Sequence, residues 1–110
     1  MNLKNNYKDC RFHKILTCLD PRQEVIFFLR DYFKECFLGR YDINSLYVYW
    51  ELEDARYTVL LRYKGDLEFK ELHRRQLNII REVFDFCESH DNLFYDLRQC
   101  TIHYTKSAAP

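Results

Sequence analysis

Apolar side chains recur at helical spacing after the first twenty residues of the chain. Asp20 can cap a helix N-terminus, Pro21 suits the first helical position, and Gly39 offers a stop further along. Between these signals the apolar positions fall on one stripe, which is typical of a helix packed on one side. The stripe consists of Val25, Phe28, Leu29, Tyr32, Phe33 and Cys36. The pattern therefore predicts a helix over residues 21–38.

A second apolar stripe at the same spacing follows Asp66, which can serve as an N-cap. This stripe consists of Phe69, Leu72, Gln76, Ile80, Val83, Phe84 and Cys87. Glu71 and Arg75 are placed as an i,i+4 ion pair on the opposite, solvated side. The pattern predicts a second helix over residues 67–89.

Between the two predicted helices, apolar and polar residues alternate with a period of two, which is typical of strands. One run contains Leu46, Val48, Trp50 and Leu52, and the other contains Tyr57, Val59, Leu61 and Tyr63. A turn centred on Asp54 and Ala55 places all eight side chains on one face, with Trp50 opposite Val59. We therefore expect a β-hairpin over residues 45–64. Its turn lacks the Gly or Asn of a tight primed turn.

Two further segments complete the predicted fold. Residues 99–105 alternate again and predict a C-terminal strand. Residues 7–19 are spaced as a short N-terminal helix, with a strand as the alternative. The whole sequence predicts one α+β domain, residues 1–110, in which a small, mainly antiparallel sheet packs against the two main helices.

Composition narrows the functional classes. Seventeen Lys and Arg balance seventeen Asp and Glu, so the chain lacks the basic excess with which proteins commonly bind nucleic acid phosphates. With only two glycines, it cannot form a Gly-rich phosphate-binding loop. No local sequence favours a particular Cys–His pair as a nucleophile and its base. We therefore expect a protein that is not an enzyme and uses no cofactor.

The cysteines indicate a cellular setting. They are Cys10, Cys18, Cys36, Cys87 and Cys100. Their number is odd, the first residues lead into no apolar stretch of a signal peptide, and no run is long enough to span a membrane. We therefore expect free thiols in a reducing cytoplasm.

Three Cys-x-x-His pairs raise the question of a zinc site, since thiolate and imidazole are zinc ligands. The pairs are Cys10–His13, Cys87–His90 and Cys100–His103. Residues three apart on a strand point to opposite faces, so Cys100 and His103 cannot both bind one metal without a bulge. Cys87 belongs to the apolar stripe of its helix, where a thiol acts as a small hydrophobic residue. Buried structural thiols are the favoured interpretation, and we expect no metal.

The second face of the predicted hairpin carries two tyrosines. In the predicted register, Tyr47 lies opposite Arg62 and Tyr49 lies opposite Leu60. Tyr and Arg are enriched at protein–protein hot spots because they combine a large contact area with a polar group. A binding surface and a plain amphipathic sheet face are equally weighted interpretations of this pattern.

Acidic residues lie near these tyrosines in the sequence and indicate that a partner would be positively charged. They are Asp42, Glu51, Glu53 and Asp54. We expect this surface, with Arg62, to bind another protein that has a basic groove, such as a nuclease toxin, as an inhibitor or immunity-type protein does. The alternative is a nucleic-acid-binding module that uses Tyr47, Tyr49, Arg62, Lys64 and the N-terminal lysines, although the acidic residues would repel phosphate. An exposed sheet edge could also pair with a second copy or with a partner strand.

Overall fold

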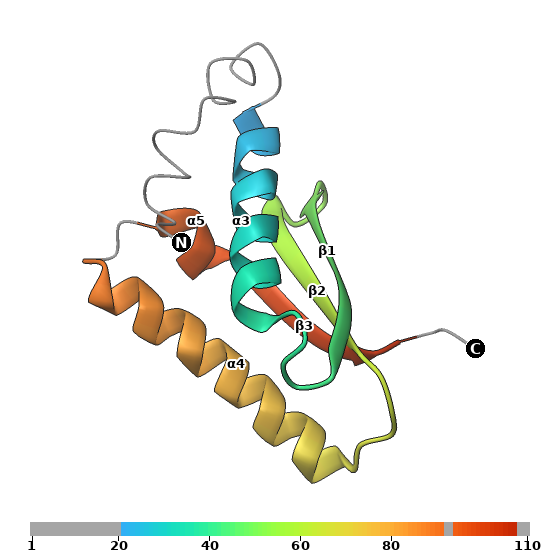
Figure 1. Cartoon of the computed structure of the whole chain (residues 1–110). Coiled ribbons are helices and arrows are strands. Elements are labelled where there is room, and N and C mark those ends of the chain that lie inside the picture. Colours follow the sequence, from blue (N-terminus) through green and yellow to red (C-terminus); the bar gives the residue numbers. More distant parts are fainter. Residues whose placement is uncertain (1–20, 92–93, 108–110) are drawn as a thin grey trace.

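A computed structural model describes residues 21–91 and 94–107 of the chain (Figure 1). In chain order, the described elements are α3 (Pro21–Phe37), β1 (Ile43–Glu51), β2 (Arg56–Tyr63), α4 (Phe69–Ser89), α5 (Tyr95–Gln99) and β3 (Thr101–Lys106). The helices pack their apolar residues against one face of a three-stranded sheet, so the expected α+β class is confirmed. The helix or strand expected over residues 7–19, and Asp20 as a cap, lie outside the described residues.

Helix α3 forms where the apolar stripe predicts it and ends one residue earlier than expected. Its buried residues are Phe28, Leu29, Tyr32, Phe33 and Phe37. After the helix the chain turns through Gly39, whose φ of 88° is rarely adopted by residues with a side chain. The turn directs the chain into β1, and α3 packs back against β1 and β2.

The expected hairpin forms, but its strands pair two residues away from the expected register. Trp50 lies opposite Tyr57 rather than opposite Val59. The loop therefore consists of residues 52–55, and Leu52, which was expected on the inner face, is exposed in this loop. A shift of two residues leaves every other side chain on its expected face, because side chains alternate along a strand with a period of two.

The third strand joins the hairpin in parallel, so the sheet is mixed. β3 pairs with β2, which makes β2 the central strand in the order β1-β2-β3. A parallel neighbour requires a long crossover connection, which α4 and α5 supply. Tyr104 is buried on the inner face and the adjacent His103 is exposed on the other, as the alternation in this segment predicts.

The packed face of α4 differs from the expected stripe. Its buried residues are Ile79, Val83 and Cys87. Phe69 and Phe84, both expected inside, are exposed. The helix begins at Phe69 with Glu68 in the N-cap position, so Asp66 is not the cap and instead forms an ion pair with Lys106. Apolar residues cover a wide arc of α4, and the positions of β3 and α5 decide which part of this arc is buried.

Aromatic rings join the helices into one core over the sheet. The ring centroids of Phe28 and Phe94 lie 5.4 Å apart, and the Phe86 ring lies 4.9 Å from Tyr32 and 5.4 Å from Phe94. Such separations are those of favourable aromatic pairs. The pairs link α3, α4 and the start of α5. Among the described helices, none combines the length and the apolar character that crossing a membrane requires.

Candidate functional site

The face of the sheet turned away from the helices is the candidate site, and we call it the outer face. The inner face is marked by Val59 and Leu61, which are fully buried, so their neighbours along the strand point outward. The register places three rows across this outer face: Ser45, Arg62 and Thr105; Tyr47, Leu60 and His103; Tyr49, Thr58 and Thr101. Glu51 and Arg56 form a fourth, shorter row beside the hairpin loop.

The two tyrosines project from β1 on the outer face. The side chains of Tyr47 and Tyr49 are 52% and 42% exposed, although both residues lie within a paired strand. Arg62 lies diagonally across from Tyr47, with its guanidinium carbon 5.4 Å from the centre of the tyrosine ring. Its Nε atom is buried and has no hydrogen-bond partner among residues 21–91 and 94–107. The cation–π contact between Arg62 and Tyr47 orients the tyrosine ring. This part of the outer face thus combines an aromatic surface with a positive charge.

Acidic residues gather at the loop end of this face. The Thr58 hydroxyl donates a hydrogen bond to the Glu51 carboxylate, and with Arg56 it lowers the pKa of that carboxyl. The Arg56 guanidinium also lies 3.2 Å from Asp54. Glu53 is exposed in the loop. Within residues 51–56, three carboxylates against one guanidinium leave two formal negative charges, and the Arg22 guanidinium of α3 lies at the same end, 4.5 Å from the centre of the Trp50 ring.

Asp42 does not belong to this acidic group. It lies just before β1, whose nine residues span about 30 Å, so it sits at the opposite end of the hairpin from Glu51. Its carboxylate is 3.0 Å from Arg75 on α4. The acidic patch expected from the sequence is thus divided, and Tyr47, Tyr49, Glu51, Glu53, Asp54 and Arg62 remain together without Asp42.

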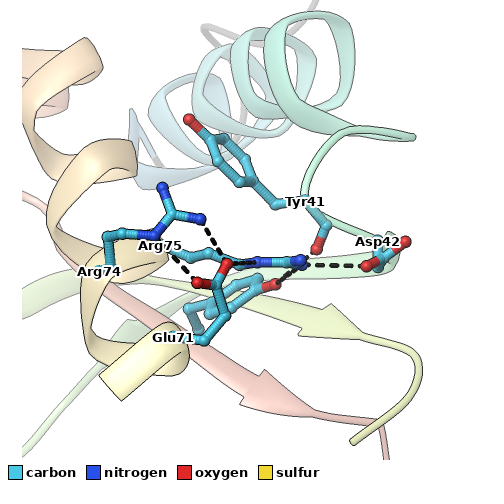
Figure 2. A network of polar contacts seen from close by, with 6 residues as sticks. Tyr41, Asp42, Glu71, Arg74 and Arg75 are labelled. Atoms are coloured by element: carbon cyan, nitrogen blue, oxygen red, sulfur yellow. Dashed lines mark hydrogen bonds and ion pairs between the residues drawn. The ribbon is translucent and has the colours of Figure 1, made fainter. Parts of the chain in front are cut away.

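Asp42 instead takes part in a polar network between the α3–β1 turn and α4 (Figure 2). Arg75 donates hydrogen bonds to Asp42 at 3.0 Å and to Glu71 at 2.8 Å, and it lies 3.4 Å from the hydroxyl of Tyr104. Tyr104 in turn donates to the backbone carbonyl of Tyr41. Hydrogen bonds from Arg74 and Arg75 lower the pKa of Glu71 to about 2. The network therefore fixes the α3–β1 turn, and its charged groups are bonded to one another.

A second contact reinforces the same turn. The Tyr41 hydroxyl donates to the Glu82 carboxylate at 2.6 Å, and the Arg40 guanidinium lies 2.9 Å from the same carboxylate. Tyr41 and Asp42 both have positive φ values, 52° and 59°. Residues other than glycine adopt this conformation only at a cost of about 1 kcal/mol or more each. The network offsets this strain, so we interpret it as a structural lock and not as a binding site.

The described thiols and imidazoles form no reactive or metal-binding group. Burial raises the pKa of Cys100 to about 12, and its thiol donates to the Leu97 carbonyl at 3.1 Å. Reactive cysteines instead have lowered pKa values. Cys87 is buried in the core, and the His90 ring lies 2.8 Å from the Phe86 carbonyl. Within residues 21–91 and 94–107, no three His, Cys, Asp or Glu side chains are arranged to hold a metal. Cys10 and His13 lie outside these ranges.

Sequence reasoning missed two parts of this arrangement. Leu60 and His103 share a row with Tyr47, but only the strand order brings β3 beside β2. The network residues were also not connected in advance, except for Glu71 and Arg75, whose spacing predicts their ion pair and whose contact is confirmed at 2.8 Å. The alternation along one strand was enough to predict that the two tyrosines point outward. Contacts between segments that are distant in the chain leave no pattern in the local sequence.

Comparison with known proteins assigns no function. No family model matches the sequence, and no curated protein or solved structure is significantly similar to it. The function of the chain is therefore inferred from its own surface chemistry.

Proposed function

We propose that this protein is a small non-enzymatic binding domain that captures another protein on the outer face of its sheet. The observation that carries the proposal is the pair of exposed tyrosines beside Arg62, on a strand face that the described helices leave open. Tyr47 and Tyr49 are held by strand pairing, so they present a large contact area with little loss of conformational freedom on binding. Leu60 and the threonines around them supply a flat, partly apolar surround.

The charge at the hairpin loop favours a basic partner. Glu51, Glu53 and Asp54 outnumber Arg56 and lie at one end of the tyrosine surface. Such an arrangement can steer a positively charged groove toward the tyrosines and then exclude that groove's own ligand. We therefore propose an inhibitor or immunity-type role, in which the partner is a basic enzyme such as a nuclease toxin. The three described free thiols fit a reducing cytoplasm as the site of action.

The experiment that tests this proposal compares capture by matched variants. The wild-type chain, Y47A/Y49A and E53K/D54K are used as baits for proteins of the source cell, with Y95A as the control. Tyr95 is exposed on α5, away from the outer face. We expect the same partner with the wild-type chain and with the control. We expect its loss with the tyrosine double variant and weaker capture with the charge-reversal variant, while all four proteins melt at similar temperatures.

Two outcomes would contradict the proposal. The first is a partner retained equally by Y47A/Y49A and the wild-type chain, because the tyrosines would then not be anchors. The second is retention of a labelled oligonucleotide at low salt, lost steeply as the salt concentration rises and abolished by Y47A/Y49A. That dependence is the signature of phosphate contacts and would assign the same face to nucleic acid.

A further inference from the structure

A second exposed apolar surface lies on α4 and is separate from the outer face of the sheet. Phe69, Leu77 and Phe84 are 81%, 44% and 45% exposed. Together with His73, whose ring stacks on that of Phe69 at 6.2 Å, they are spaced by four, four and seven residues along the helix. Side chains at these intervals share one side of a helix. We call this side the α4 stripe.

The α4 stripe continues into a pocket beside the edge of the sheet. Phe84 and the partly buried Ile80 line a pocket of about 220 Å³ together with Leu97, Cys100 and Ile102. The pocket opens next to β3, which pairs only with β2 in the part of the chain that the structure describes and therefore offers backbone hydrogen-bonding groups on its other side. Exposed phenylalanine and leucine side chains thus adjoin a mainly apolar hollow, lined also by Arg98, that such side chains can fill.

The charges beside the stripe indicate what covers it. Lys70 and Glu88 lie at the two ends of α4, and their separation of eighteen positions corresponds to about five helical turns. Both side chains therefore flank the stripe on the same side. If two copies of α4 pack antiparallel across a two-fold axis, Lys70 of one copy meets Glu88 of the other, and the reverse contact forms as well. The two charges at the ends of this flank are thus complementary to each other across the two-fold axis.

We propose that the α4 stripe is the interface of a symmetric homodimer, in which α4 of one copy packs antiparallel against α4 of a second copy. Leu77 lies near the middle of the helix, so it contacts the other copy close to the two-fold axis. Phe84 lies nearer the C-terminal end, beside the pocket. Two-fold dimers are the commonest protein assemblies, and exposed apolar patches of this kind are typical of interfaces. The dimer leaves the outer face of the sheet free.

The first test measures the oligomeric state by sedimentation over a series from about 1 μM to about 100 μM protein, a range in which moderate affinities are resolved. We expect a concentration-dependent dimer for the wild-type chain. Leu77→Lys should raise the dimer Kd by about a hundredfold, because it places a charge at the centre of the interface. Leu52→Lys is the matched control, since Leu52 is exposed in the hairpin loop, and it should leave the Kd unchanged.

The second test uses the charge pattern. Lys70→Glu and Glu88→Lys should each weaken the homodimer about tenfold, because each creates two like-charge contacts per dimer. An equimolar mixture of the two variants should recover a heterodimer of wild-type strength, since both contacts are then attractive. Recovery of affinity in the mixture supports the antiparallel arrangement, because non-specific association of apolar helices would not depend on the charge pairing.

Several results would overturn the proposal. A chain that stays monomeric over the whole concentration series has no such interface. A dimer that survives Leu77→Lys but is lost with Tyr47→Lys uses the outer face of the sheet instead. A monomer whose melting temperature falls with Leu77→Lys, but not with Leu52→Lys, has its stripe covered by another segment of its own chain. A mixture of the charge variants no stronger than either alone would exclude the antiparallel pairing.

Discussion

The hairpin has a carboxylate–arginine contact at each of its two ends, but the surroundings of the two contacts differ. At the α3–β1 end, Asp42 meets Arg75, whose side chain is 20% exposed and which also binds Glu71. At the loop end, Asp54 meets Arg56, whose side chain is 44% exposed. The first contact fixes a strained turn against another element, whereas the second links the hairpin loop to the first residue of β2. The same kind of ion pair thus stabilises the fold at the α3–β1 end and lies on the exposed surface at the loop end.

Among the substitutions considered, replacing Arg75 should lower the free energy of unfolding the most. Arg75→Ala removes charge-assisted hydrogen bonds to Asp42 and Glu71 and leaves the strained turn with only its Tyr41 and Arg40 contacts. We expect the free energy of unfolding to fall by about 2–3 kcal/mol, measured by urea denaturation. Arg74→Ala is the matched control, because Arg74 is exposed and pairs only with Glu71 among the described residues, and it should cost at most about 0.5 kcal/mol. Equal losses in the two variants would mean that the turn does not depend on Arg75.

An intermediate effect is expected in the hairpin loop. Ala55 has a φ of 49°, a conformation that glycine adopts without steric cost. Ala55→Gly should therefore raise the free energy of unfolding by about 0.5 kcal/mol, after the greater freedom of glycine in the unfolded chain is subtracted. Glu53→Gly, in the same loop but without a positive φ, should instead be neutral or destabilising. Thermal melts of both variants decide the matter, and destabilisation by Ala55→Gly would contradict the loop geometry.

The smallest effect is expected from acid. The pKa of Glu71 lies near 2, below its ordinary value of 4.5, so this carboxylate stabilises the fold above about pH 4.5 and stops doing so as the pH falls toward 2. The melting temperature of Glu71→Gln should be lower than that of the wild-type chain at pH 7, and the gap should close as the pH approaches 2. Glu53→Gln, in the exposed loop, provides the background effect of removing a charge. A gap that widens in acid would reverse the assigned role of Glu71.

Local sequence patterns predicted the helices and strands better than the way these elements pair and pack. α3 formed within one residue of its expected end because Pro21 and Gly39 mark its limits. The register of the hairpin was wrong by two residues because both registers keep the same residues on each face, so alternation alone does not distinguish them. The buried side of α4 was predicted only in part: Val83 and Cys87 are buried as expected, whereas Phe69 and Phe84, which are as apolar, are exposed.

The candidate site shows the same limit. The outward direction of Tyr47 and Tyr49 followed from alternation, which needs only the sequence of one strand. The grouping of Asp42 with Glu51 failed because the two residues lie at opposite ends of an extended strand, while Arg75, thirty-three residues away in sequence, is adjacent to Asp42. Charge patches on strands therefore need the tertiary fold before they can be assigned.

The parallel pairing of β3 also has a consequence for biosynthesis. The central strand β2 precedes its partner β3 in the chain by the whole length of α4 and α5. While the ribosome is still making those helices, one side of β2 has no neighbour within the sheet, and the hydroxyl of Tyr104 that secures the Tyr41 carbonyl has yet to be added. The nascent chain thus carries an open, aggregation-prone strand edge until residues 101–106 emerge, and this interval is when a chaperone would be most useful to it.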